Sequence, residues 1–145
     1  MFSNLGLIAE DYFKKGYNCA EALSKAVAEK CQIGCESIPN IATPFGAGIG
    51  GKGSLCACLS GGVVAIGLLY GRSDAKDMDR KLQAYEKAKL FYDRFVERLG
   101  TTNCLDICDV DLSTEEGLKR FHDEKIRDKC GKYVRETGDI LSEIL

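Results

Sequence analysis

The stretch FGAGIGGKGSLCACLSGGVVAIGLLYG, residues 45–71, decides the expected fold, because it joins a glycine-rich loop to a long uncharged segment. No charged side chain occurs between Leu55 and Tyr70, and a helix that is apolar on every side is normally buried. We therefore expect an apolar helix from about Cys56 to Gly71 at the centre of the protein. Its small residues would let neighbouring backbones approach closely; they are Gly61, Gly62 and Ala65.

The apolar run is too short and too rich in glycine for a transmembrane helix. Spanning a bilayer takes about 20 mostly apolar residues, whereas this run includes Ser60 and two glycines. The first residues, MFSNLGLIAEDYF, lack the basic start of a secretory signal and reach Glu10 before any apolar core is complete. We expect a cytoplasmic protein without membrane insertion.

The remaining segments predict more helices and almost no strands. Apolar residues at spacings of three and four indicate amphipathic helices. The clearest helix covers residues 78–99 and ends at Gly100; others include residues 5–13, 19–31, 114–121 and 134–144, with a short turn at 104–108. Residues 35–53 contain Pro39, Pro44 and the loop glycines and are read as a short helical turn and a loop. The prediction is an all-α, single-domain helical bundle over residues 1–145.

Composition excludes some partners. The chain has 145 residues, is 45% hydrophobic and carries a formal net charge of −2, with its lysines and arginines spread along the chain. There is no basic stripe of the kind that neutralises nucleic-acid phosphates. We expect no nucleic-acid partner, whereas the glycine-containing apolar helix would suit a symmetric contact in a homodimer.

Cysteine is the outstanding feature of the chain. It has eight cysteines, which in a reducing cytosol indicate metal or redox chemistry rather than structural disulfides. Four of them follow helix-capping residues: Cys19 after Asn18, Cys56 two residues after Ser54, Cys104 after Asn103, and Cys130 two residues after Asp128. Unpaired N–H groups and the helix dipole in a first turn stabilise a thiolate, so lowered thiol pKa values are expected there.

The cysteines and their contexts also carry a resemblance. The segments GYNCAEAL, residues 45–71, FVERLGTTNC and Cys130 ahead of the C-terminal helix resemble a prokaryotic family of redox-active proteins described by its cysteine pattern, C_GCAxxG_C_C. The resemblance covers nearly the whole chain and implies that Cys19, Cys56, Cys104 and Cys130 are the family cysteines. It also implies a helical fold similar to the non-haem part of split-Soret cytochromes, where an iron–sulfur centre is found.

Three kinds of chemistry remain open for these four cysteines. The leading hypothesis is an iron–sulfur cluster that acts in electron transfer, with an electron donor and acceptor as partners of unidentified nature. The alternative is a thiol–disulfide redox protein or sensor that uses the same cysteines without metal. Zinc ranks third because the C-x2-C spacing of structural zinc sites is absent. Haem attachment through C-x-x-C-H is excluded because no such motif occurs, and we expect no haem.

The other four cysteines differ in how strongly the sequence favours them as additional ligands. The family's Cys-Gly-Ala is Cys56-Ala57-Cys58 here, so close backbone approach at residue 57 is not expected and Cys58 is a candidate additional ligand. Cys108 is a second candidate because it lies one helical turn after Cys104. Cys31 and Cys35 are read as incidental.

The loop glycines have a nucleotide-binding alternative. Residues 46–53 nearly complete a P-loop, but that motif needs a preceding strand, which Pro39 and Pro44 disfavour. We instead expect the small residues to let the loop pass close to a cluster or to another backbone. Its N–H groups would then point toward the sulfur of Cys56, with Gly51 and Gly53 as cofactor-binding residues.

The chain offers no recognisable set of catalytic residues. His122, the only histidine, lies among charged neighbours and is read as a surface residue. No serine, histidine and carboxylate set can be picked out, so whether the protein is an enzyme is left open.

Overall fold

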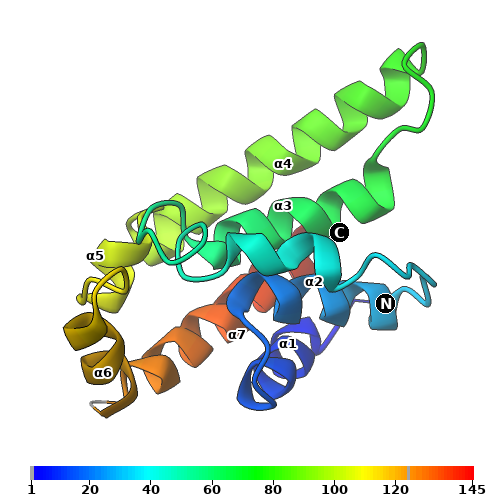
Figure 1. The fold of residues 1–145 in the computed structure, drawn as a ribbon. Coiled ribbons are helices and arrows are strands. Elements are labelled where there is room, and N and C mark those ends of the chain that lie inside the picture. Colours follow the sequence, from blue (N-terminus) through cyan, green and yellow to red (C-terminus); the bar gives the residue numbers. More distant parts are fainter. Residues whose placement is uncertain (1, 124) are drawn as a thin grey trace.

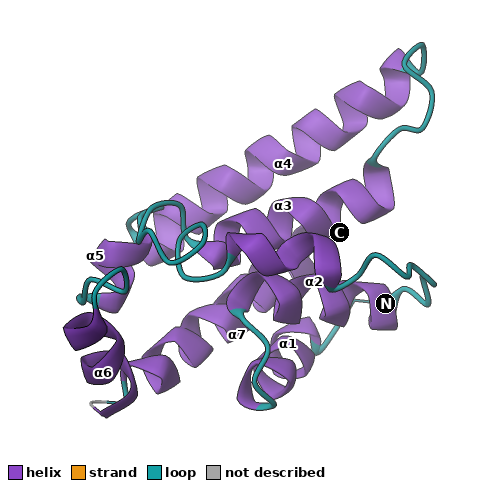
Figure 2. Cartoon of the chain, in the orientation of Figure 1, coloured by secondary structure: helices purple, strands orange, loops and turns teal. Residues whose placement is uncertain are grey.

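The computed structural model describes residues 2–123 and 125–145, which form packed helices with no strand among them (Figures 1 and 2). The all-α prediction is confirmed. The helices are α1 (Leu5–Lys14), α2 (Cys19–Lys30), the 3-10 helix η1 (Asn40–Phe45), α3 (Ala57–Tyr70), α4 (Met78–Leu99), α5 (Cys104–Cys108), α6 (Glu115–Asp123) and α7 (Ile126–Ile144).

Five helices close a ring. Each packs on the next in the order α1, α2, α3, α4 and α7, and α7 returns to α1. Helix α7 also contacts α2 and α3 across the ring and carries the two short helices α5 and α6 at one end of the bundle (Figure 1). The core is built on the side chains that the apolar spacing pointed inward, including Leu23 of α2, Phe91 and Phe95 of α4, and Val134 of α7.

The apolar helix α3 packs against α2, α4 and α7, as a central helix should. A Cβ atom at Gly61 would lie 2.5 Å from Cα of Ala20, so the predicted close approach of two backbones is confirmed there. Burial on every side holds for the first half of α3 only, because Val63 is 43% exposed. The helix therefore lines one side of the core, with part of its second half exposed, and does not run through the centre of the core.

Two of the three glycines of α3 pack against other helices, and the third, Gly67, is exposed. Gly61 faces Ala20 of α2, and Gly62 faces the ring of Phe91 of α4. The homodimer was predicted from the apolar helix as a whole, and the dimer stays a prediction. Within the described residues, no helix combines the length and the apolar character needed to cross a membrane.

Candidate metal and redox centre

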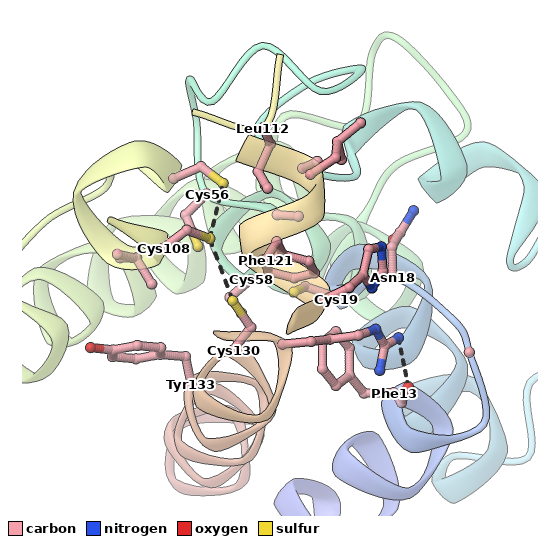
Figure 3. Close-up of a pocket in the computed structure, with 18 residues that line it drawn as sticks. Phe13, Asn18, Cys19, Cys56, Cys58, Cys108, Leu112, Phe121, Cys130 and Tyr133 are labelled. Carbon is pink, nitrogen blue, oxygen red and sulfur yellow. Dashed lines mark hydrogen bonds between the residues drawn. The ribbon is translucent and has the colours of Figure 1, made fainter. Parts of the chain in front are cut away.

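Six of the eight cysteines line one cavity of about 240 Å³ at the end of the bundle where α2, α3 and α7 begin (Figure 3). They come from four parts of the chain: Cys19; Cys56 and Cys58; Cys104 and Cys108; and Cys130. The four cysteines that the resemblance singled out are thus brought together, and so are both candidate additional ligands. Cys31 and Cys35 do not line this cavity.

Cys19 is positioned by a capping box. The Asn18 side chain accepts a hydrogen bond from the Glu21 N–H (2.9 Å), and the Glu21 carboxylate accepts one from the Asn18 N–H (2.8 Å). Cys19 is therefore the first residue of α2, as predicted, and it is half-buried at the cavity. The Asn18 amide also donates to the Thr43 carbonyl (3.1 Å), which ties this helix start to η1.

Cys56 is the N-cap residue of α3, and Cys58 lies in its first turn. The Cys58 thiol is the main cause that lowers the pKa of Cys56, and the N–H groups of Cys58 and Leu59 lower it further against the opposing effect of burial. The fully buried Cys58 has its pKa raised by contact with Cys19, then by Cys56 and by burial. Of Cys56 and Cys58, Cys56 is therefore the one whose lowered pKa favours the thiolate.

Cys104 is held against the glycine-rich loop. Its N–H donates to the Ser54 carbonyl (2.6 Å), the Cys56 N–H donates to the Thr102 carbonyl (2.8 Å), and Leu55 and Asn103 form an isolated antiparallel bridge. Asn103 caps α5 by accepting from the Asp106 N–H (3.2 Å). Two segments almost fifty residues apart therefore place Cys56 and Cys104 side by side.

The loop needs glycine at position 48. Its φ of +71° is in the left-handed region, and a Cβ there would lie 2.5 Å from the Ser54 nitrogen and 2.7 Å from Cβ of Cys104. The N–H groups of Gly51 and Gly53 donate to the carbonyls of Gly46 (3.2 Å) and Ala47 (3.1 Å). They do not point at the Cys56 sulfur as expected, and neither residue lines the cavity, so their cofactor-binding role stays a prediction without a contact behind it.

Cys130 is the fifth residue of α7, which begins at Ile126. The prediction that Cys130 lies in the first turn is therefore wrong, because Asp128 lies inside the helix rather than at its cap. An acidic residue is favourable in either place, so the residue type alone does not distinguish them. The Cys130 sulfur still reaches the cavity and lies 3.4 Å from the sulfur of Cys108.

Cys108 joins two neighbouring thiols. Its sulfur lies 3.8 Å from that of Cys104 and 3.4 Å from that of Cys130 (Figure 3, dashed lines). The contact with Cys108, followed by burial, raises the pKa of Cys104, so the lowered value expected at this helix start is not found. The contact with Cys104 lowers the pKa of Cys108, but the contact with Cys130 and burial outweigh it and raise the value to about 12.

The rest of the cavity wall is mainly apolar, with two basic residues. Phe13, Leu112 and Phe121 are among its side chains. Arg127 donates to the carbonyls of Phe13 (2.9 Å) and Tyr17 (3.1 Å), and its guanidinium lies 3.9 Å from the centre of the Phe13 ring. The guanidinium thus fastens the first turn of α7 to the end of α1, which keeps Cys130 beside the cavity.

His122 also lines the cavity, although it is exposed. Its ring packs edge-on against that of Phe121, with 5.5 Å between the ring centres. The prediction of a surface histidine is right about exposure but missed this position. No pattern in the chain signals it, because the position depends on how α6 folds back onto α7.

The glycine loop lacks the structural context of a P-loop, and the described residues form no cluster of ligands for a single metal ion. The loop follows the 3-10 helix η1 and not a strand, so the P-loop alternative lacks its required context. Across the described part of the chain, no three cysteine, histidine, aspartate or glutamate side chains converge closely enough to hold one metal ion.

Comparison with known proteins finds a matching family and a relative of similar sequence. The family model described as "Putative redox-active protein (C_GCAxxG_C_C)" matches residues 17–144. An uncharacterised protein from Archaeoglobus fulgidus is 34% identical over 97 residues, which cover 62% of this chain and 64% of that protein. No solved structure matches.

Proposed function

Because the chain belongs to the C_GCAxxG_C_C family of redox-active proteins, we propose that it binds an iron–sulfur cluster through Cys19, Cys56, Cys104 and Cys130 and acts in electron transfer. The observation that carries the proposal is the meeting of these four cysteines, from four separate segments, at one cavity. Cysteine thiolates are the usual ligands of iron–sulfur clusters.

The cavity fits such a group in size and charge. A volume of about 240 Å³ is far more than a single metal ion needs. Helices α2, α3 and α7 begin at this end, and helix starts favour negative charge such as that of a cluster with thiolate ligands. A bound cluster would supply an electron that can be taken up and released, at a potential that depends on burial and on hydrogen bonds to sulfur.

The residues of this chain have distinct roles in the proposal. The capping box of Asn18 and Glu21 orients Cys19, and the backbone bonds between the loop and residues 102–105 set the separation of Cys56 from Cys104. The mainly apolar walls surround the sulfurs with side chains of low polarity, and burial of this kind is one of the factors that set a cluster's potential. Cys58 and Cys108 are additional donors that could complete or replace a ligand.

The test is a visible spectrum of protein purified without oxygen, with iron, zinc and acid-labile sulfide assayed on the same sample. We expect broad visible absorption with iron and sulfide in comparable amounts. Single Cys→Ser changes at 19, 56, 104 or 130 should each reduce iron content and colour. Cys35→Ser is the matched control, because Cys35 lies outside the cavity. A colourless protein that takes up no iron and sulfide on reconstitution would refute the proposal, as would zinc in place of iron.

A metal-free thiol–disulfide protein is the second candidate. It is favoured by the sulfur contacts of Cys108 with Cys104 and Cys130, which are close enough for thiol chemistry without large movement. This function predicts that the number of free thiols falls by two at one potential in a redox titration of protein that contains no metal. An unchanged thiol count across the titration would exclude it.

A further inference from the structure

We propose that Cys108, which is not one of the four family cysteines, forms a reversible disulfide with Cys130 in the metal-free protein when a hydroperoxide oxidises it. Of the two sulfur contacts at Cys108, the 3.4 Å contact to Cys130 is the shorter. Bond formation requires the two sulfurs to approach by about 1.4 Å, to the usual length of about 2.05 Å.

Cys104 is the poorer partner for Cys108. The two residues lie four apart in the single turn of α5, where Cβ atoms are separated by about 5–6 Å. A disulfide needs about 3.5–4.5 Å between its Cβ atoms, so a bridge within α5 would unwind that turn. Cys104 is also held in place by its N–H bond to the Ser54 carbonyl (2.6 Å). Cys108 and Cys130 lie on different helices, α5 and α7, so a bond between them does not require the turn of α5 to unwind.

The neighbourhood of the pair suits a small oxidant. The residues Cys108 and Cys130 are 4% and 6% exposed, but both line the cavity, which is large enough to admit a hydroperoxide as small as hydrogen peroxide. Their low exposure limits competing reactions with bulkier thiols.

The reaction is balanced in two steps. One thiol of the pair loses its proton, and its sulfur attacks a peroxide oxygen; the O–O bond breaks, leaving a sulfenic acid and one water. The sulfur of the second thiol then attacks the first sulfur, the S–O bond breaks, and the hydroxyl leaves as water with the second thiol's proton. Two thiols lose two electrons in total, and one hydrogen peroxide becomes two molecules of water.

The disulfide has a consequence for the proposed cluster. Cys130 is one of the four proposed ligands, and a sulfur held in a disulfide cannot ligate as a thiolate. Oxidation would therefore lower iron loading until the disulfide is reduced. The disulfide itself does not depend on the proposed cluster, whereas this consequence does.

The test uses the full-length, reduced, metal-free protein, treated with equimolar hydrogen peroxide and then with an alkylating agent. Trypsin separates the partners, because Cys104 and Cys108 lie on fragment 99–119 and Cys130 on fragment 130–132. Mass spectrometry of the wild-type digest should find these two fragments linked, and fragmentation of the linked pair should locate the bond at Cys108. Absence of the link, or its location at Cys104, overturns the proposal.

Two matched variants check the assignment. The linked fraction should persist in Cys104→Ser and fall about tenfold or more in Cys108→Ser, because only the second variant removes a partner. Circular dichroism before oxidation selects variants that retain the helical fold. Persistence of the link in folded Cys108→Ser would refute the pairing.

A metal-loading experiment then separates the two proposals. Peroxide-treated wild type should bind about tenfold less iron on reconstitution than reduced wild type, with recovery after a phosphine reductant, because Cys130 is withdrawn. Loss of loading without the linked fragments would refute the disulfide as its cause. If even the reduced protein binds no iron and sulfide, the proposal of a cluster is refuted. The mass spectrum of the digest still tests whether the disulfide forms.

Discussion

Substitution of Gly48 by alanine is expected to separate the effect of the glycine loop on stability from its effect on the sulfur site. The added Cβ would lie 2.5 Å from the Ser54 nitrogen, 2.7 Å from the Gly53 carbonyl carbon and 2.7 Å from Cβ of Cys104. None of these atoms belongs to a flexible side-chain end, so the backbone of the loop must move away from residue 104.

The expected cost has two parts. Alanine in the left-handed conformation costs about 1 kcal/mol. Displacement of the loop weakens the hydrogen bonds from the Ser54 N–H to the Gly48 carbonyl (2.9 Å) and from the Gly53 N–H to the Ala47 carbonyl (3.1 Å), each worth about 1 kcal/mol. The free energy of unfolding should fall by about 3 kcal/mol in total.

Gly50→Ala is the matched control. Gly50 also has a positive φ, +57°, but a Cβ there meets nothing within 4 Å. It should lose only the backbone part, about 1 kcal/mol. The difference of about 2 kcal/mol between the two variants corresponds to a melting temperature roughly 6 °C lower for Gly48→Ala.

Two assays check this reasoning. Urea unfolding of the reduced, metal-free protein, followed by circular dichroism, gives the free energies, and reconstitution with iron and sulfide gives the loading. We expect Gly48→Ala to load less iron than Gly50→Ala even where both are folded, because Cys104 has moved. Equal stability of the two variants would refute the reasoning, because it would mean that the contact with Ser54 and Cys104 does not constrain the loop.

Three further substitutions test the packing of α2 on α3 and the hydrogen bond between Tyr12 and Glu29. Gly61→Ala should lower the free energy of unfolding by about 3 kcal/mol, because its Cβ would lie 2.5 Å from Cα of Ala20. Gly67→Ala, whose Cβ would meet nothing within 4 Å, should be neutral or stabilising by up to about 1 kcal/mol. Chemical unfolding of both variants measures the difference, and equal effects would contradict the close packing of α2 on α3. Tyr12, whose hydroxyl donates to Glu29, has its pKa raised from 10.0 to about 12, so its contribution is complete below pH 10 and lost as the pH rises through 12. Tyr12→Phe should therefore cost about 1 kcal/mol near pH 8, with a difference from wild type that shrinks at alkaline pH; a difference independent of pH would refute the assignment.

Short-range sequence patterns are sufficient to predict the start of a helix that begins at a side-chain cap. Asn18 and Asn103 each accept a hydrogen bond from an N–H three residues later, and Cys19 and Cys104 begin their helices as predicted. A cap of this kind is a contact within four residues, so residue type and spacing are enough to predict it. The same holds for the end of α4 at Gly100, which has a φ of +80°.

Helix starts that depend on distant segments are harder to predict. The sequence suggests Ser54 as the cap of the apolar helix, but its N–H and carbonyl bond to Gly48 and Cys104, and α3 begins only at Ala57. The sequence likewise suggests Asp128 as a cap, and it lies within α7. In both cases a polar residue suits several positions near a helix start, and pairing with another part of the chain decides among them.

Residue order alone was enough to predict the helical class, the apolar helix and the cysteines worth testing, because periodicity, capping and composition are properties of neighbouring residues. It could not show that Cys108 contacts Cys130, that Cys58 lies beside Cys19, or that His122 lines the same cavity as the cysteines. Those relations depend on the packing of α5, α6 and α7 over separations of many residues. Such packing is settled by burial of the whole core, and no short segment encodes it.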